Sequence, residues 1–345
     1  MPVYSFNPMT DRRWDALLAS HPRSSVFHRR EWLQTLADTY GYQPIAITSA
    51  EPGKPLSDGI VFCEVESWIT GKRLVSLPFS DHSEPLLSEA SSDHEFVEWL
   101  VNATKKRRLR YIELRPIEWS SPAGSLSAGQ SFWLHTLDLT KPLEELFKNL
   151  DKNNLQRRIH KAERENLEYE KGSSEQLLDE LFELLIITRR RHQLLPQPRS
   201  WFRNLARNFA SDFEIRVVRK DGHAIAAIIT LRHRHTIVYK YGCSDEKFHY
   251  LAGMPFLFWK IISEGKAEQA LEMDFGRTEP ENEGLLRFKD QFGATRRQIT
   301  YLRYSQTNKE ASSISSHVPY AGKIFSVLPG AVSWRLGSML YRHMG

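Results

Sequence analysis

Apolar residues follow two different spacings in the first part of the chain. Around Trp14 and again around Trp32 they recur every three or four positions, which is the spacing of a helix with one buried face. Elsewhere, short apolar runs lie between clusters of Pro, Gly and Ser, which is typical of strands joined by turns. The pattern predicts helices over residues 14–18, 31–40 and 94–104 and strands over residues 45–47, 60–65, 74–77 and 111–114.

A second series of helices and strands begins near His135. It predicts helices over residues 151–166, 175–192, 255–266 and 284–291 and strands over residues 137–139, 214–218, 224–231, 236–241 and 271–275. Residues 120–131 are rich in Ser, Gly and Ala and predict a flexible loop that acts as a hinge between the halves. Both halves place helices before strands, so we expect an α/β protein with a duplicated domain.

The composition is that of an ordinary globular protein. A chain of 345 residues predicts about two domains, and 41% hydrophobic with 26% charged residues excludes a disordered or collagen-like chain. The net charge of +5 allows an anionic partner without requiring one. Cys63 and Cys243 are too far apart for a metal-binding pair, and we expect both to be reduced.

Both ends of the chain bear on its location. The first residues lack the basic and apolar regions of a secretion signal, and no apolar run approaches the roughly 18 residues of a membrane span. We therefore expect a cytoplasmic protein. Residues 318–345 combine apolar side chains with Lys323, Arg335 and Arg342. This tail either packs on the first domain or lies as an amphipathic helix on the inner membrane surface, which would make the protein peripheral to that membrane.

A lysine occupies an apolar helix face near the end of the second half. At about 100° per residue, Lys289 lies about 40° from Leu285, on the side that also carries Phe288. One interpretation is that its methylene groups pack while the ammonium reaches water. The other is that it borders a cavity, where it can polarise a carbonyl group or hold a phosphate.

Basic residues continue the faces of two further helices. Arg189 and His192 follow the leucine stripe of residues 175–192, and Arg157 and Arg158 lie on the helix over residues 151–166. Most such charges are solvated, and a histidine on an apolar face is usually a core residue. Together, however, these cations suit a diphosphate or a nucleic-acid backbone, and Arg189 could grip a carboxylate or phosphate.

One strand and the residues that follow the last predicted strand add polar groups. Strict alternation over residues 236–241 directs Tyr239 and Tyr241 to the same face, which suits a wall for an extended substrate. Asp274 and Arg277 flank a glycine and form either an internal ion pair or part of a cleft. The free amides of the helix that begins near Pro255 could hold an anion. No nucleophile, zinc, Walker or dinucleotide motif is present, so we expect neither covalent catalysis nor a metal.

Four segments in order resemble the FemAB-like branch of the GNAT superfamily. They are RRIHKAEREN, ITRRRHQLLPQP, YKYGCSD and DFGRTEPENEGLLRFKDQFGA, and the resemblance is strongest over residues 135–304. The branch includes the peptidoglycan aminoacyltransferases and the BioF2-like or CelD-type acetyltransferase domains of exopolysaccharide clusters. The chain is most similar to the FemAB-like proteins of exosortase systems. The turn after Trp32 holds Thr35 and Leu36 where the peptidoglycan enzymes commonly have a lysine.

The resemblance implies tandem GNAT-like domains, each a mixed, largely antiparallel sheet flanked by helices. We assign residues 1–134 to the first, residues 135–305 to the second, which carries the main cleft, and residues 306–345 to the tail. It also implies that Phe288 and Lys289 match a Phe-Lys pair at the reaction centre, with Asp274 as a further catalytic candidate. The substrate-binding candidates are Phe288, Arg157, Arg158, Arg189, His192, Tyr239, Tyr241 and Arg277.

The implied activity is transfer of an acyl or aminoacyl group from an activated donor to an amine of a cell-envelope or exopolysaccharide precursor. No tightly bound cofactor is expected, and acyl-CoA or aminoacyl-tRNA serves as the donor co-substrate. The expected partners are an anionic nucleotide- or lipid-linked saccharide and tRNA, but not DNA. Two alternatives stay open: an acyl-CoA-dependent N-acetyltransferase that acts on a sugar amine, and a non-catalytic binding module of a polysaccharide assembly system.

Overall fold

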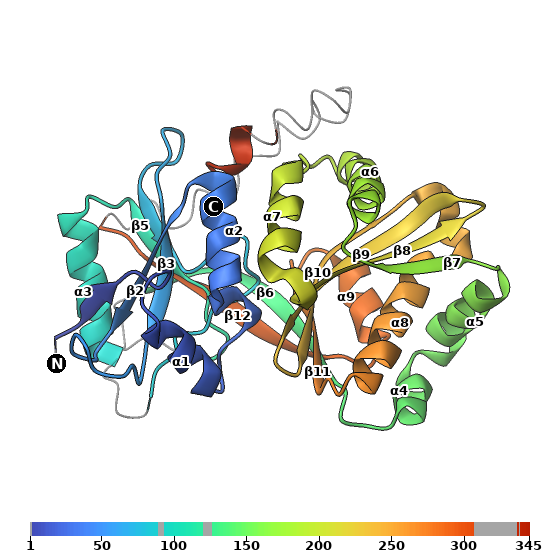
Figure 1. Ribbon diagram of the computed structural model, residues 1–345, viewed down its shortest axis with the longest axis horizontal. Coiled ribbons are helices and arrows are strands. Elements are labelled where there is room, and N and C mark those ends of the chain that lie inside the picture. The colour runs from blue at the N-terminus through green and yellow to red at the C-terminus, as the bar shows by residue number, and fades with distance from the viewer. Residues whose placement is uncertain (1, 89–92, 120–125, 307–336, 338) are drawn as a thin grey trace. The chain divides into compact units, whose positions relative to one another are not determined.

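The computed structural model describes residues 2–88, 93–119, 126–306, 337 and 339–345 and contains two compact units (Figure 1). The first unit runs to Ser131 and takes in the chain again from Ile299, together with the described C-terminal residues. The second unit begins at Phe132 and ends at Gln298. The division at residue 131 lies near the expected boundary at residue 134, whereas residues 299–305, which we assigned to the second domain, belong to the first unit.

The first unit builds a mixed sheet in the order β1-β2-β3-β4-β5-β12. Each neighbouring pair is antiparallel except β4 and β5, which are parallel. Its elements are β1 (Tyr4–Phe6), α1 (Arg13–Ser20), a 3₁₀ turn (Val26–His28), α2 (Arg30–Tyr40), β2 (Gln43–Thr48), β3 (Ile60–Val65), β4 (Arg73–Val75), α3 (Asp93–Lys106), β5 (Tyr111–Leu114) and β12 (Thr295–Tyr304).

The second unit orders its strands β7-β8-β9-β10-β11-β6, and only β10 and β11 are parallel. Its elements are β6 (Ser127–Asp138), α4 (Leu143–Asn149), a π-helical turn (Lys152–Gln156), α5 (Arg157–Arg164), β7 (Glu168–Gly172), α6 (Glu175–Arg191), α7 (Arg199–Phe209), a 3₁₀ turn (Ala210–Asp212), β8 (Phe213–Lys220), β9 (His223–His233), β10 (Thr236–Ser244), a 3₁₀ helix η4 (Glu246–Leu251), α8 (Gly253–Ala267), β11 (Glu272–Thr278) and α9 (Glu283–Asp290).

The two units repeat one topology. In each, three antiparallel pairings are followed by one parallel pairing and a final antiparallel one. A parallel pair needs a crossover connection, and a helix supplies it in both units, α3 between β4 and β5 and α8 between β10 and β11. The expected mixed α/β fold with tandem, largely antiparallel sheets is therefore confirmed, and the repeated order agrees with a duplicated domain.

The core of the second unit explains why polar and apolar residues do not alternate along β9. Residues 225–231 are all buried, because α6 contacts one side of this region and α8 also packs on β9. A strand covered on both faces has no solvent side on which polar residues could alternate. The buried side chains of α8 that join this core are Phe256, Leu257, Phe258, Ile261 and Ile262.

Several elements differ from the sequence-based expectations. The flexible loop expected over residues 120–131 is wrong from Ser127 onward, because these residues begin β6, and residues 120–125 lie outside the described residues. The helix expected over residues 151–166 is an α-helix only in α5 and is preceded by a π-helical turn. The elements β1, β7, α7 and β12 were not predicted. In β7 polar positions weaken the apolar period, and no residue is fully buried. The helix α7, by contrast, has a clear apolar face, with Trp201, Phe202, Leu205 and Phe209 buried.

The described end of the expected tail lies on the first unit. Tyr42 donates its hydroxyl to the carbonyl oxygen of Arg342 at 2.9 Å, and the buried Arg73 donates to the carbonyl oxygens of His343 and Gly345. The rest of the tail, residues 307–336 and 338, lies outside the described residues. Within the described ranges, no helix combines the length and the apolar character needed to cross a membrane.

Candidate functional site

The second unit holds a cavity of about 440 Å³ at the N-terminal end of α8. Strands β9 and β10 form its floor, η4 and the start of α8 form one wall, and α9 supplies another. Residues from α5 and from the end of α6 complete the lining. The cavity thus lies where the chain leaves the sheet to start the crossover helix.

The lining of this cavity includes aromatic and aliphatic side chains, which we call its apolar half. They are Tyr239, Met254, Phe258, Leu285 and Phe288. The rings of Tyr239 and Phe258 are 4.8 Å apart, and those of Phe258 and Phe288 meet edge to face at 5.4 Å. Such ring contacts fix the wall in one arrangement, so this half can receive an apolar group of defined shape.

The lining also includes cationic and polar side chains, which we call its cationic half. Arg158 of α5 and Arg191 of α6 both border it, and His249 of η4 lies between Arg191 and Ser244. The Nε2 atom of His249 is 3.3 Å from a guanidinium nitrogen of Arg191 and 3.0 Å from the hydroxyl oxygen of Ser244. Thr188 accepts a hydrogen bond from the backbone N–H of Ser244 at 2.9 Å, which holds the end of β10 against α6.

The backbone adds positive potential to the same half. A helix leaves its first N–H groups outside its own hydrogen-bond ladder, and α8 begins at Gly253, in the cavity wall. The residue before it, Ala252, adopts φ +59°, which turns the chain sharply into the helix. A Cβ atom on Gly253 would lie 3.1 Å from that of Ala226, so glycine permits this close approach to β9. The arrangement suits a phosphate or another anion.

Burial changes the protonation of the cavity's basic groups. Burial lowers the pKa of His249, and the nearby charge of Arg191 lowers it further. The pKa of His192 is lowered by the same two causes, in the same order, with a further contribution from Arg189. Burial also lowers the pKa of Arg158. At neutral pH both histidines are therefore mainly neutral, and the two arginines carry the positive charge.

The expectation that Tyr239 and Tyr241 share one face is wrong. The pairing of β10 with β9 skips Lys240, which makes a β-bulge between the two tyrosines. An extra residue reverses the alternation of side chains. Tyr239 therefore lines the cavity against α8, whereas Tyr241 packs on Phe202 of α7 and accepts hydrogen bonds from Trp201 and Gln197, both at 2.9 Å.

Lys289 lies on the buried side of α9, as expected, but it is not among the residues that line this cavity. Its side chain is 1% exposed, and its Nζ atom donates to the carbonyl oxygens of Gly276 at 2.9 Å and Arg277 at 3.3 Å. Asp274 accepts a hydrogen bond from the N–H of Gly276 at 2.6 Å. These contacts surround a second bulge, in β11, where the pairing with β6 skips Phe275 and Gly276.

The remaining candidates divide between the cavity and other places. Four expected substrate-binding residues line the cavity, namely Arg158, His192, Tyr239 and Phe288. Arg157, which comes directly before Arg158 in α5, is exposed. Arg189 is half-buried and does not line the cavity. Arg277 stacks over the ring of Phe132 at 3.9 Å. The roles of all these residues stay predictions.

Sequence analysis missed three cavity residues. The pattern singles out none of Arg191, His249 and Ser244. Arg191 is the last residue of α6, where the helical period no longer fixes the direction of a side chain. His249 lies in a 3₁₀ helix, and no periodic pattern marks it. The one available signal was the short distance in sequence from Ser244 to the start of the predicted helix at Pro255.

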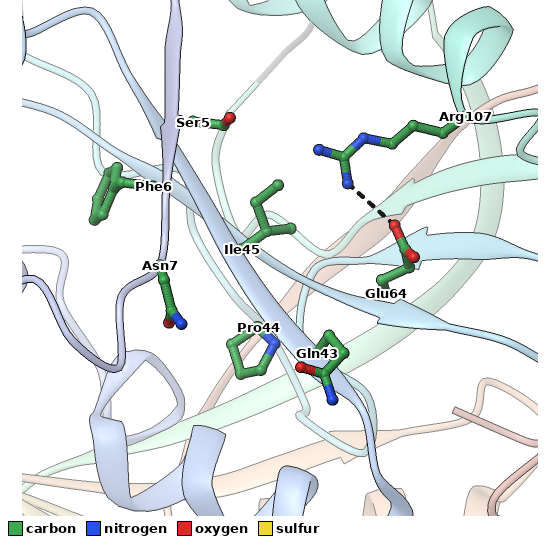
Figure 2. Close-up of a pocket in the computed structure, with 8 residues that line it drawn as sticks. All are labelled: Ser5, Phe6, Asn7, Gln43, Pro44, Ile45, Glu64 and Arg107. Atoms are coloured by element: carbon green, nitrogen blue, oxygen red, sulfur yellow. Dashed lines mark hydrogen bonds and ion pairs between the residues drawn. The ribbon is translucent and has the colours of Figure 1, made fainter.

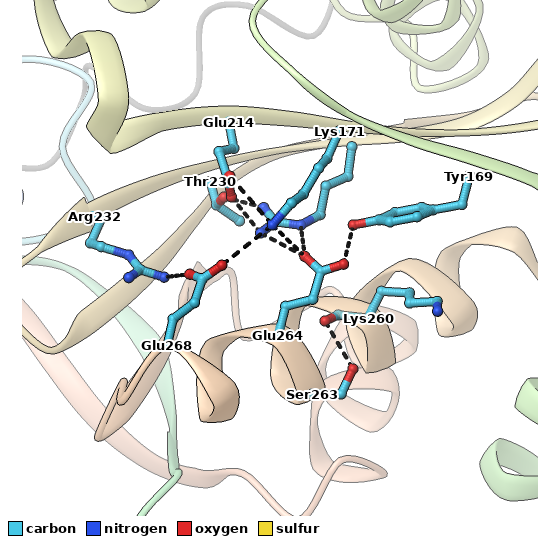
Figure 3. Close-up of polar contacts among 10 residues, drawn as sticks. Tyr169, Lys171, Glu214, Thr230, Arg232, Lys260, Ser263, Glu264 and Glu268 are labelled. Atoms are coloured by element: carbon cyan, nitrogen blue, oxygen red, sulfur yellow. Dashed lines mark hydrogen bonds and ion pairs between the residues drawn. The ribbon is translucent and has the colours of Figure 1, made fainter.

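An ion-pair network anchors the C-terminal half of α8 to the sheet (Figure 3). Arg216 of β8, which is 1% exposed, contacts Glu264 of α8 at 3.2 Å and Glu214 at 2.5 Å. Lys171 of β7 lies 3.3 Å from both Glu264 and Glu268. This network holds the C-terminal half of α8 against β7 and β8. It thereby also fixes the position of the helix N-terminus at the cavity.

The first unit has a cavity of about 400 Å³ beside β1 and β2 (Figure 2). Its charged groups are Glu64 and Arg107, which pair with each other at 3.0 Å. Lys72 also pairs with Glu64, at 2.8 Å. Because these charges satisfy one another, we regard the cavity of the second unit as the candidate site.

Comparisons with known proteins point to the same region. Residues 151–290 match the model of an acetyltransferase (GNAT) domain family. This segment contains nearly the whole cavity lining, from Arg158 to Phe288. No curated protein matches the chain.

Solved structures extend the likeness to both units. FemX superposes with a TM-score of 0.69 at 14% identity, over 90% of this chain and 98% of that one. The C-terminal domain of a putative lysylphosphatidylglycerol synthetase from Agrobacterium fabrum gives 0.56 at 15% identity, over 87% and 92%. A tandem GNAT protein from the clavulanic acid biosynthesis pathway gives 0.53 at 8% identity, over 88% and 98%. At these identities the likeness concerns the fold.

Proposed function

Because residues 151–290 form a GNAT-type acyltransferase domain, we propose that this enzyme transfers an acyl or aminoacyl group from an activated anionic donor to an amine of a cell-envelope or exopolysaccharide precursor. The observation that supports the donor is that apolar and cationic side chains both line one cavity. The acceptor class rests on the sequence resemblance described above.

The cationic half supports an anionic donor. Arg158 and Arg191 place two guanidinium groups in the lining, and α8 begins in the same cavity wall, where its first N–H groups add positive potential. A phosphate group bound there would leave the rest of the donor to extend along the apolar half, beside Tyr239 and Phe288. Such placement brings the acyl carbon to one defined position, which is the main requirement of a reaction between two bound substrates.

The reaction is attack of a neutral amine on an ester or thioester carbonyl. A C–N bond forms, the carbonyl oxygen carries the negative charge in the tetrahedral intermediate, and the C–S or C–O bond of the donor then breaks. The leaving thiolate or alkoxide takes up the proton that the amine loses, directly or through a base. Tyr239 lines the cavity, and we propose its hydroxyl as the protein group that takes part in this transfer. No enzyme nucleophile is needed.

Two donors fit different features. The apolar half favours an acyl thioester such as acyl-CoA, which corresponds to the alternative of an N-acetyltransferase that acts on a sugar amine. The cations of α5 beside Arg158, namely the exposed Arg157 and Arg164 and the half-buried Lys161, favour aminoacyl-tRNA because its backbone extends beyond the cavity. The match to an acyltransferase domain argues against the non-catalytic binding module.

Thermal unfolding with each donor tests the proposal. The full chain would be heated alone, with acetyl-CoA, with aminoacyl-tRNA and with uncharged tRNA. A ligand that binds only the folded protein raises the midpoint of unfolding, and the rise grows with the ratio of ligand concentration to dissociation constant. We expect one of the two donors to raise it, and the Arg158→Gln variant to lose that effect. If neither donor raised the midpoint, the proposed function would be wrong.

A further inference from the structure

The loop that joins β3 to β4 in the first unit presents two apolar side chains to solvent. Trp68 is 86% exposed and Ile69 is 46% exposed. The loop holds them there through a tight turn, since the N–H of Gly71 donates to the carbonyl oxygen of Ser67 at 2.8 Å. The Ser67 hydroxyl oxygen also accepts from the N–H groups of Ile69 at 3.1 Å and Thr70 at 2.9 Å. The exposure of Trp68 is therefore imposed by the turn.

The described C-terminal residues lie against the same loop. The His343 ring meets the Trp68 ring edge to face at 5.7 Å, and its Nδ1 atom is 3.0 Å from the Ser67 hydroxyl oxygen. The Thr70 hydroxyl donates to the carbonyl oxygen of His343 at 3.0 Å. The neighbouring Met344 is 44% exposed, and Met339 is 67% exposed. We call Trp68, Ile69, Met339 and Met344 the Trp68 patch.

We propose that the Trp68 patch inserts into the interface of a lipid bilayer that contains anionic phospholipids. Tryptophan is favoured at the level of the lipid head groups because its ring is apolar and its N–H is polar. The patch consists of protruding side chains, and four of them offer too little area for a stable protein–protein interface. A protruding apolar side chain on a fixed turn can enter a bilayer without any rearrangement of the protein.

The charges around the patch favour an anionic surface. Arg342 is exposed next to His343, whereas the nearby carboxylates of Glu64 and Glu66 are each paired with Lys72 at 2.8 Å. The sequence from Ala311 to Gly345 contains Lys323, Arg335 and Arg342 but no Asp or Glu. Each cation near an anionic bilayer adds attraction that falls with added salt.

Co-sedimentation with vesicles tests this proposal. The full chain would be mixed with vesicles of phosphatidylcholine alone and with vesicles that also contain phosphatidylglycerol. We expect stronger binding to the second kind and a decrease with added salt. Trp68→Ser should weaken binding by about tenfold, since loss of most of one aromatic side chain from an apolar contact has an effect of that order. Because Trp68 is exposed, this variant should keep the thermal stability of the original protein.

A matched control distinguishes binding through the Trp68 patch from nonspecific vesicle binding by any exposed aromatic residue. Tyr250 is a 63% exposed aromatic residue of the second unit, and Tyr250→Ser should bind vesicles as the original protein does. Absence of vesicle binding, or equal binding by Trp68→Ser, would overturn the proposal. So would a dimer in sedimentation velocity that Trp68→Ser converts to a monomer, because the patch would then serve a second copy of the chain. The donor-binding measurements do not depend on this result.

Discussion

The Nζ atom of Lys289 lies 2.9 Å from the carbonyl oxygen of Gly276, the glycine at the bulge of β11. Gly276 has φ +71°, a conformation that favours glycine, and the bulge turns its carbonyl group away from the partner strand. The ammonium satisfies this carbonyl inside the protein, where an unpaired one would be costly. The β-bulge in β11 thus explains why Lys289 is buried on the apolar face of α9.

The first prediction concerns Lys289→Met. The methionine keeps the apolar contacts but leaves two buried carbonyl groups without their donor, so we expect the free energy of unfolding to fall by roughly 1–3 kcal/mol. Urea denaturation measures this change. Turnover of the folded variant then tests the role that the sequence resemblance implies. A fall of about 10²–10³ would keep Lys289 as an electrostatic group of the reaction, and unchanged turnover would reject that role.

The sequence was sufficient to predict elements with a strong apolar period. It was insufficient where the backbone departs from regular helix or strand geometry. The apolar runs of β3 and β5 predicted both strands with their correct bounds, because burial alone decides their pattern. The bulge at Lys240 has no such signature, and it places Tyr239 and Tyr241 on opposite faces. Likewise, Lys289 was correctly placed on a buried face, but its partner could not be identified because the bulge in β11 forms only through pairing with β6.

The second prediction compares two neighbouring arginines of α5. Arg158 lines the cavity and Arg157 is exposed, although both have the same charge and lie on the same helix. Arg158→Gln should weaken donor binding by about tenfold or more, since a charge-assisted contact to a phosphate contributes about 1.5–3 kcal/mol. Arg157→Gln should change it little. Isothermal titration with the donor measures both dissociation constants, and equal effects would show that only overall charge matters.

The third prediction is a pH dependence of donor affinity. Burial and the charge of Arg191 lower the pKa of His249, so the imidazole is neutral at neutral pH. A bound anion stabilises the protonated form and raises this pKa, so protons are taken up on binding. Affinity should therefore increase as the pH falls below neutral.

Titration calorimetry at several pH values checks this dependence. His249→Gln should remove most of it, while the amide can still contact Ser244. His192 also lines the cavity with a lowered pKa, so His192→Gln is the matched comparison. Because His249 lies between Arg191 and Ser244, we expect His249→Gln to flatten the pH profile of donor affinity more than His192→Gln does. A profile that keeps its slope in His249→Gln would contradict this assignment.

The fourth prediction concerns Glu113, a buried carboxylate of the first unit. It pairs with Arg115 of the same segment at 2.9 Å and with Arg303 of β12 at 2.6 Å. Burial by itself would raise its pKa, but the two guanidinium groups outweigh burial and lower it. A carboxylate with a lowered pKa stabilises the folded state at a pH above its unfolded value, and that stability is lost as the pH falls through its folded value.

Glu113→Gln should therefore lower the free energy of unfolding near neutral pH by about 3–5 kcal/mol, because it leaves two largely buried arginines without their anion. In acid the variant and the original protein should approach one another, since Glu113 is then protonated in both states. Glu283 is the matched control, because its pair with Arg287 is exposed on both sides and Glu283→Gln should change stability little. Urea denaturation at neutral and acid pH measures the difference. If Glu113→Gln lowered the free energy of unfolding by the same amount at neutral and acid pH, the side chain would act by packing and not by its charge.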